Sequence, residues 1–197
     1  GGIYHSIYDD FYWFTNFSDT DFAYGKALSQ TGGTTVIRIA DADVLPFDFT
    51  NFAETVRRYL GELKKGLSGM QDKIKERNKQ LSEGVFTALA DPKEKSVPPG
   101  VEEIPPFINF APLENAIETL TRSADRYDKA VKNRAGKNLS EQVLKSVNQR
   151  LIQSERKLTH QDGLPIRPWF KHLIYAPGFY TGYGVKTIPG VREALEQ

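Results

Sequence analysis

One long run of apolar residues at helical spacing constrains the fold of this chain more than any other feature. Between positions 49 and 74, apolar side chains recur every three or four residues: Phe49, Phe52, Ala53, Val56, Tyr59, Leu60, Leu63, Leu67, Met70 and Ile74. This spacing places them on one face of an α-helix, which must bury that face against other elements. Residues 113–131 and 139–158 show the same pattern. The sequence therefore predicts a mainly α-helical fold, a helical bundle.

Two proline- and glycine-rich regions interrupt the helical pattern. The first, residues 91–109, holds five prolines, a density that no helix or central strand tolerates: Pro92, Pro98, Pro99, Pro105 and Pro106. The second begins near Gln161 and is punctuated by glycine and proline as far as Gly190, where a last helix is expected. We therefore expect an extended loop at 91–109 and a long irregular C-terminal segment. Loops of this length are usually functional or interfacial.

The region before residue 43 gives mixed signals. Ser18 followed by Asp21 is typical of a capping box and predicts a helix that starts near Asp19 and is interrupted at Gly32-Gly33. Residues 34–39 are mostly β-branched, and propensity alone predicts a strand there.

Composition excludes several classes of function. Lys and Arg number 26 against 25 Asp and Glu, so the chain lacks the basic surplus that sequence-independent binding of nucleic acid requires. The absence of cysteine excludes disulfides and cysteine-based zinc sites. No apolar run approaches the roughly 20 residues of a spanning helix, so we expect no membrane contact by this segment. The three histidines, His5, His160 and His172, have no metal-site spacing, and each alone favours a structural or exposed role.

Two triplets fit the acceptor pattern for N-glycosylation. They are Asn16-Phe17-Ser18 and Asn138-Leu139-Ser140. Such triplets arise by chance, and they are compatible with a secreted or lumenal glycoprotein.

Three short motifs together carry a family resemblance. Residues 4–9 read Tyr-His-Ser-Ile-Tyr-Asp, and residues 44–48 read Val-Leu-Pro-Phe-Asp at the start of the long helix. Residues 163–177 read Gly-Leu-Pro-Ile-Arg-Pro-Trp-Phe-Lys-His-Leu-Ile-Tyr-Ala-Pro, and Ile-Pro-Gly follows at 188–190. In these motifs the chain resembles the C-terminal part of the glutamate carboxypeptidase II (prostate-specific membrane antigen) family, which includes the transferrin receptor.

The resemblance implies a division of the chain into two parts. Residues 1–42 correspond to the C-terminal remnant of a two-zinc peptidase domain, in which 34–39 is helical. Residues 43–197 correspond to the transferrin receptor-like helical dimerisation domain, with the Pro-rich loop 91–109 as an insertion. We therefore expect an excised piece of a longer protein that forms a homodimer. By the same resemblance, the parent is the extracellular or lumenal/vacuolar part of a single-pass membrane protein.

The resemblance also implies site residues, all of them functional only in the parent. His5 corresponds to the last zinc ligand of a two-zinc site whose other ligands and general base are absent here. Tyr183 corresponds to the tyrosine of a Lys-Tyr pair that holds the C-terminal glutamate of the substrate, and Gly182 replaces the lysine. Lys186 lies nearby, and nothing in the sequence establishes it as a substitute. We expect the fragment to have no catalytic residues and no zinc of its own.

Three functional hypotheses follow from these observations. The first is a homodimerisation domain of a glutamate carboxypeptidase-like protein, inactive as a fragment. The second is part of an active zinc-dependent exopeptidase in which the loop at Tyr183 completes the pocket for a peptide substrate. The third is part of a receptor-like parent without catalysis. His5 favours a peptidase over a receptor, because a receptor does not need the zinc ligand.

Overall fold

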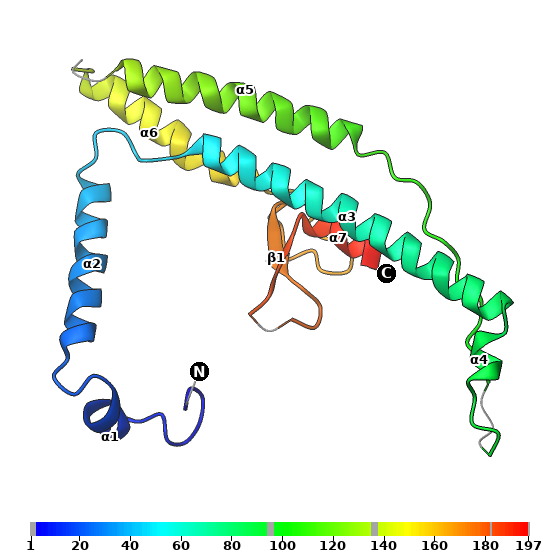
Figure 1. Cartoon of the computed structure of the whole chain (residues 1–197). Coiled ribbons are helices and arrows are strands. Elements are labelled where there is room, and N and C mark those ends of the chain that lie inside the picture. Colours follow the sequence, from blue (N-terminus) through cyan, green and yellow to red (C-terminus); the bar gives the residue numbers. More distant parts are fainter. Residues whose placement is uncertain (1–2, 94–96, 135–137, 182, 197) are drawn as a thin grey trace. The chain divides into compact units, whose positions relative to one another are not determined.

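Helices dominate the computed structural model, which describes residues 3–93, 97–134, 138–181 and 183–196 (Figure 1). Contacts divide the chain into two compact units, Gly1–Phe47 with Leu139–Leu151 and Asp48–Asn138 with Ile152–Gln197. The mainly α-helical fold predicted from periodicity is confirmed. The family-based boundary between residues 42 and 43 stays a prediction. Among the described residues, no helix combines the length and apolar character needed to cross a membrane.

The first unit begins with short helical turns and one long helix. These are α1 (Phe11–Trp13), the π-helical turn η1 (Phe14–Ser18) and α2 (Ala23–Ala40). The buried Asp19 carboxylate accepts hydrogen bonds from the backbone N–H groups of Tyr24 (3.0 Å) and Gly25 (2.7 Å). The predicted start near Asp19 is therefore wrong by one turn, because Asp19 satisfies the first free N–H groups of the helix from outside it.

Helix α2 continues through Gly32-Gly33 and residues 34–39, so the predicted interruption and the propensity-based strand are both wrong. Within the helix, the Thr31 and Thr35 hydroxyls donate to the carbonyls of Ala27 and Thr31, each at 2.9 Å. A helix satisfies its own backbone groups, whereas a strand needs a neighbour, and the described residues pair no strand with 34–39. Hydrogen bonding therefore overrides the β-propensity of the segment.

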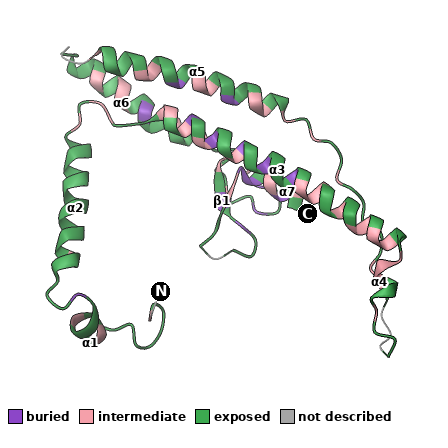
Figure 2. Ribbon diagram, viewed as in Figure 1, coloured by how far each residue is buried: buried purple, intermediate pink, exposed green. Residues whose placement is uncertain are grey.

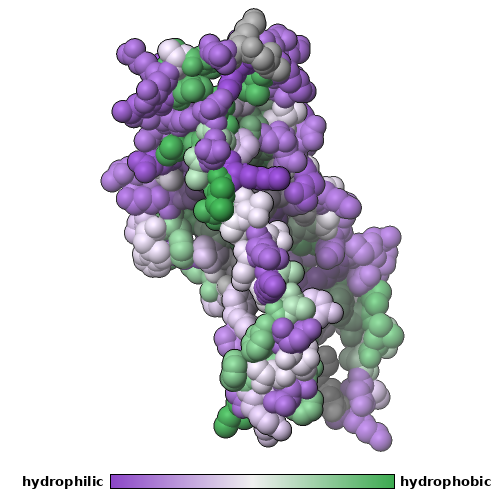
Figure 3. Space-filling model, turned by 90° about the vertical axis from the view of Figure 1, so that its left-hand side faces the viewer, coloured by the Kyte–Doolittle hydropathy of each residue, from purple (hydrophilic) through white to green (hydrophobic). Residues whose placement is uncertain are grey.

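Much apolar surface of the first unit is exposed. Helix α2 has no buried residue, and the exposed apolar side chains of the unit include Tyr8, Phe11, Tyr12, Phe17, Tyr24, Leu28, Val36 and Ile37. The space-filling view shows hydrophobic groups at the molecular surface between hydrophilic ones (Figure 3). The first part of α6 (Glu141–Arg156) belongs to this unit. There the Asn148 side chain accepts a hydrogen bond from Leu45 N–H (3.0 Å) and donates one to the Asp43 carbonyl (2.8 Å).

The second unit is built on two antiparallel helices, α3 (Phe49–Ser82) and α5 (Ala111–Asn133). Buried residues follow one side of α3, as the periodicity predicts, and Val56 and Leu60 pack with Ile117 of α5 (Figure 2). Ion pairs cross between the helices, Arg57 to Glu118 at 2.8 Å and Lys64 to Glu114 at 2.6 Å. Residue numbers rise along α3 as they fall along α5, which establishes the antiparallel orientation.

The Pro-rich loop after α3 and the short α4 (Val85–Ala88) returns along the second half of α3. Asn78 of α3 donates to the Glu102 carbonyl (2.7 Å) and accepts from Glu102 N–H (3.0 Å). Gln71 donates to the Pro105 carbonyl at 2.8 Å. The predicted extended loop is thus confirmed for 91–93 and 97–109, and residues 94–96 lie outside the described residues.

The C-terminal segment contains a small sheet that the sequence analysis does not predict. Strands β1 (Tyr175–Pro177) and β2 (Val185–Thr187) pair antiparallel, with Ala176 opposite Lys186. Helix α7 (Pro189–Glu196) follows, close to the predicted start at Gly190. Ile174 also packs against the α3–α5 core, so the hairpin is attached to the helical pair.

Candidate functional site

Backbone hydrogen bonds attach the C-terminal segment to the end of α6. Leu173 N–H donates to the Leu158 carbonyl at 2.8 Å, and His160 N–H donates to the Lys171 carbonyl at 2.8 Å. Glu155 of α6 lies 2.9 Å from His172 Nε2, and His172 Nδ1 accepts from the N–H of Ile174 at 3.1 Å. These bonds fix where the hairpin begins, although the sequence around them is irregular.

The neighbourhood of His172 also affects Tyr175. The two rings stack with centroids 4.4 Å apart and planes 8° from parallel. Desolvation raises the pKa of the Tyr175 phenol above its usual value, and the nearby Glu155 carboxylate and Tyr59 raise it further. The pKa shift follows from packing and charge at the base of the hairpin.

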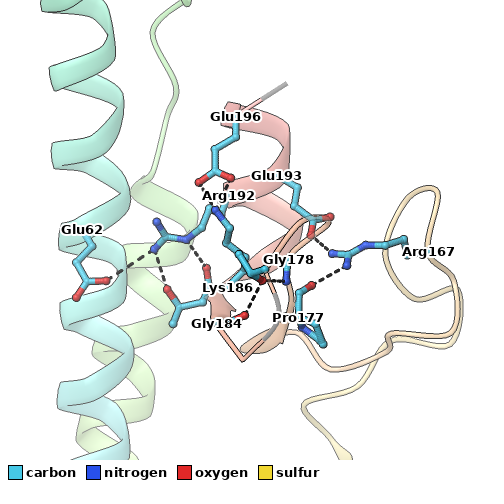
Figure 4. A network of polar contacts seen from close by, with 11 residues as sticks. Glu62, Arg167, Pro177, Gly178, Gly184, Lys186, Arg192, Glu193 and Glu196 are labelled. Carbon is cyan, nitrogen blue, oxygen red and sulfur yellow. Dashed lines mark hydrogen bonds and ion pairs between the residues drawn. The ribbon is translucent and has the colours of Figure 1, made fainter. Parts of the chain in front are cut away.

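A buried ion pair connects the motif at 163–177 to the last helix (Figure 4). The Arg167 guanidinium pairs with the Glu193 carboxylate of α7, and each side chain is only 8% exposed. Arg167 Nη1 also donates to the Pro177 carbonyl at 2.6 Å, at the end of β1. The guanidinium carbon lies 5.0 Å from the ring centroid of Phe170 and 4.3 Å from that of Phe179. One cation thus holds β1, α7 and the following loop together.

A pocket of about 370 Å³ lies between the loop after β1 and α7. Its described lining residues are Gly178, Phe179, Tyr180, Thr181, Lys186, Glu193 and Glu196. The Thr181 hydroxyl closes the loop, because it accepts from Gly178 N–H (2.9 Å) and donates to the Gly184 carbonyl (2.7 Å). A side chain at position 178 would stand 2.8 Å from that hydroxyl, so the turn favours glycine.

The cationic groups beside this pocket are paired with carboxylates. Lys186 Nζ lies 2.9 and 2.7 Å from the two carboxylate oxygens of Glu196, and Arg167 is paired with Glu193. Arg192 on α7 donates to the carbonyl and hydroxyl of Thr187, at 3.0 and 2.7 Å, and lies 3.7 Å from Glu62 of α3. The pocket therefore combines an apolar wall with neutralised charges, and an added anion would have to displace a carboxylate to bind Lys186.

The site residues implied by the resemblance lie in different places. Tyr183 belongs to the loop between β1 and β2 and is 85% exposed. Gly182 lies outside the described residues. His5 is exposed in the first unit, with its backbone in the left-handed region (φ 63°) and its ring 3.9 Å from that of Tyr4. His160 lies 3.8 Å from Asp162, and His172 bonds to Glu155.

The described residues contain no group of three or more His, Cys, Asp or Glu side chains that could hold a metal. Within that part of the chain, no such group therefore gathers around His5. The expectation that the fragment does not bind zinc stays a prediction.

Two features of the site were missed by the sequence analysis. The Arg167–Glu193 pair joins residues 26 positions apart in a segment without periodicity, and β1 and β2 have only three residues each. The sequence holds one signal for the ion pair. Arg167 is a charged residue between prolines and aromatic residues in the motif that carries the resemblance.

Known proteins resemble this chain along most of its length. Residues 108–197 match the family described as the transferrin receptor-like dimerisation domain. The chain is 31% identical over 194 residues to the probable glutamate carboxypeptidase LAMP1 of Arabidopsis thaliana, covering 98% of this chain and 23% of that protein. It is 28% identical over 193 residues to a probable glutamate carboxypeptidase of Arthroderma benhamiae, with 98% and 22% covered. Identity to the aminopeptidase NAALADL1 of Rattus norvegicus is 20% over 191 residues, with 97% and 21% covered.

The chain thus spans less than a quarter of the length of these curated relatives. The resemblance stated from the motifs is confirmed along nearly the whole chain. Residues 108–197 of this chain are thus similar to the transferrin receptor-like dimerisation domain family.

Proposed function

We propose that this region is the homodimerisation domain of a glutamate carboxypeptidase-like protein. The observation that carries the proposal is the match of residues 108–197 to a dimerisation domain family. Within the matched part, α5 packs on α3 through Ile117, and Ile174 packs against the same core. A two-fold dimer needs a self-complementary surface on each chain.

The mass in solution tests this proposal. Light scattering and sedimentation of the purified chain at about tens of micromolar, where weak interfaces still associate, should give the mass of two chains. A mass that stays at one chain over this range would contradict the proposal.

We infer that the fragment by itself is not a catalyst, and that zinc belongs to the parent. Metal-assisted hydrolysis needs several ligands and an activated water, and His5 supplies one ligand. Calorimetry with zinc should therefore show no tight stoichiometric site in this chain. A one-to-one site would mean that His160 or His172 converges with His5.

The second candidate function, a contribution to the substrate pocket of an active exopeptidase, is favoured by the hairpin. The loop that carries Tyr183 borders a pocket of about 370 Å³ whose walls are anchored by Arg167. Because Lys186 is paired with Glu196, it does not replace the charge of the lysine that Gly182 displaces. A receptor-like parent without catalysis is the third candidate. The presence of the metal ligands in the full-length protein would favour the exopeptidase, and their absence would favour the receptor-like parent.

The specificity of the full-length protein tests this second candidate. A charge-assisted hydrogen bond to a substrate carboxylate is worth roughly 1.5–3 kcal/mol, about ten- to a hundredfold in kcat/KM. Without that bond, substrates ending in Glu, Leu and Ala should be hydrolysed with comparable kcat/KM. A strong preference for Glu, lost in Lys186→Met, would show that Lys186 leaves Glu196 to bind substrate.

We propose an extracellular or lumenal/vacuolar location for the parent, with N-linked glycans on this region. Both acceptor residues, Asn16 and Asn138, are exposed, as glycan attachment requires. Asn16 Nδ2 donates to the Tyr12 carbonyl at 2.7 Å, and a glycan there would leave one N–H for this bond. Mass spectrometry before and after enzymatic deglycosylation tests each site, and an unmodified full-length protein from its native source would contradict the proposal.

A further inference from the structure

One face of α3 lies on the side of the helix away from α5, with Arg192 of α7 near one end of it and the Pro-rich loop beside the other. The residues that contact α5 include Arg57, Leu60 and Lys64, and at 100° per residue Gly66 and Gly69 lie about half a turn away. A groove of about 770 Å³ lies on this face, and its lining includes Lys65 and Met70 of α3 and Glu102 of the Pro-rich loop.

Two of the residues that line this groove, Gly66 and Gly69, have no side chain. A Cβ atom built at Gly66 or Gly69 meets no other atom within 4 Å. Two glycines three residues apart on one face allow the backbone of another helix to approach closely. By itself this would mark no site, because small residues on a helix face often have no partner.

The charges that flank the glycines point to an occupant. Glu62, Gly66, Gly69 and Lys73 are spaced by four, three and four residues, which is the spacing of a helix–helix seam. Glu62 is half-exposed at 3.7 Å from Arg192, and Lys73 is exposed and has no ion pair among the described residues. The seam thus carries a negative charge at Glu62 and a positive charge at Lys73. Each of these groups is exposed enough to form an ion pair with a second chain.

This order of charges is complementary to itself when the helix is reversed. In an antiparallel pair centred between residues 67 and 68, Glu62 faces Lys73 of the second copy, and Lys73 faces Glu62. Gly66 then faces Gly69, and the next layer outward places Tyr59 opposite Glu76. No layer from Tyr59 to Glu76 brings like charges together, and the two-fold symmetry makes every favourable contact twice.

We propose that a second copy of this chain docks on this face of α3, antiparallel, through the Glu62–Gly66–Gly69–Lys73 seam. This inference rests on the proposed dimerisation and assigns the α3 face to it. Electrostatic complementarity fixes the register of the pair, and the glycines set the close approach of the helices.

Charge reversal provides the first test. A homodimer of Lys73→Glu brings two carboxylates together at each end of the seam, and a homodimer of Glu62→Lys brings two ammonium groups together there. Each variant alone should therefore dissociate at least about tenfold more readily than wild type. Mixed together, the two variants should form a heterodimer of wild-type affinity, because both pairs are then attractive. Sedimentation of each variant and of the mixture measures this, and the rescue cannot come from misfolded protein.

Matched glycines on α3 provide the second test. Gly69→Gln lies on the seam, whereas Gly61→Gln lies on the same helix off the seam, also with no atom within 4 Å of a built Cβ. Both changes raise helix propensity, so both variants should stay folded. Only Gly69→Gln should weaken the dimer, by at least about tenfold.

The outcomes separate this inference from the proposed function. A wild-type chain that remains monomeric contradicts the dimerisation itself. A wild-type dimer that is unchanged by Lys73→Glu and by Gly69→Gln leaves dimerisation intact and overturns the assignment to α3. Failure of the mixed variants to associate, when each alone is monomeric and folded, overturns the antiparallel register.

Discussion

The buried Arg167–Glu193 pair makes a sharp prediction about the stability of the C-terminal hairpin. Glu193→Gln keeps the shape and an oxygen acceptor but removes the negative charge beside a guanidinium that is 8% exposed. Arg167 keeps its hydrogen bond to Pro177 and its contacts with Phe170 and Phe179. The substitution therefore tests the uncompensated buried charge and leaves the packing in place.

The expected effect is large because the remaining charge has little water around it. Removing one partner of a buried ion pair costs about 3–5 kcal/mol. If this cost lowers the free energy of local opening of the hairpin, the amides there should exchange faster. At 1.4 kcal/mol per tenfold, the increase is about a hundredfold to a few thousandfold. The reporting amides are Ile188, which donates to Ile174 at 2.7 Å, and Leu173, which donates to Leu158 at 2.8 Å.

Hydrogen exchange followed by mass spectrometry is the assay, and Glu114→Gln is the matched control. Glu114 pairs with Lys64 at 2.6 Å, but both side chains are about half exposed, at 45% and 50%. An exposed pair contributes about 0.2–1 kcal/mol, so the control should quicken exchange by less than about tenfold. Replacing both buried partners, Arg167→Met with Glu193→Leu, should restore much of the protection. Exchange at Ile188 in Glu193→Gln within about threefold of wild type would refute the reasoning.

Two further predictions concern pH and the start of α2. Burial raises the pKa of Tyr127 and of Tyr175 above the unfolded value of about 10, so the unfolded chain loses these protons first as pH rises. Stability should be complete below about pH 10 and fall above it in urea titrations, and a double Tyr→Phe variant should flatten that fall. Asp19→Ala removes the acceptor for Tyr24 and Gly25, which should cost about 1–2 kcal/mol and quicken exchange of those two amides. Unchanged exchange there would mean that another group caps α2.

The long helices were predictable because their signal is local and periodic. The stripe from Phe49 to Ile74 marks the side of α3 on which Val56, Leu60, Leu63 and Leu67 are buried. The Pro-rich loop was predictable for the same kind of reason, since proline restricts the backbone at its own position. In these segments the residue types and their local spacing are enough to predict the backbone conformation.

The hairpin and its ion pair were not predictable in this way. Whether Arg167 is buried depends on Glu193, on the Pro177 carbonyl and on two aromatic rings, and no spacing in the sequence relates these positions. The same holds for the start of α2, where Asp19 caps a helix that begins at Ala23. Tertiary contacts decide both cases, and family resemblance located the hairpin only through its motif.

The seam on α3 and the hairpin meet at Glu62, and their independence can be tested. Arg192 donates to the Thr187 carbonyl and hydroxyl at 3.0 and 2.7 Å, whereas Glu62 lies 3.7 Å away. The hairpin should therefore keep its geometry when Glu62 turns to Lys73 of a second copy, because the shorter bonds of Arg192 remain.

Lys73→Glu should accordingly dissociate the dimer without loosening the hairpin. The comparison has to be made at dilutions where wild type and variant are both monomeric, since association stabilises by mass action. Under those conditions the exchange rates of Ile188 and Leu173 should agree within about twofold, because Lys73 contributes no ion pair to the described part of the monomer. Faster exchange in monomeric Lys73→Glu would show that the α3 face supports the hairpin directly, and the effect of this substitution on association could then be indirect.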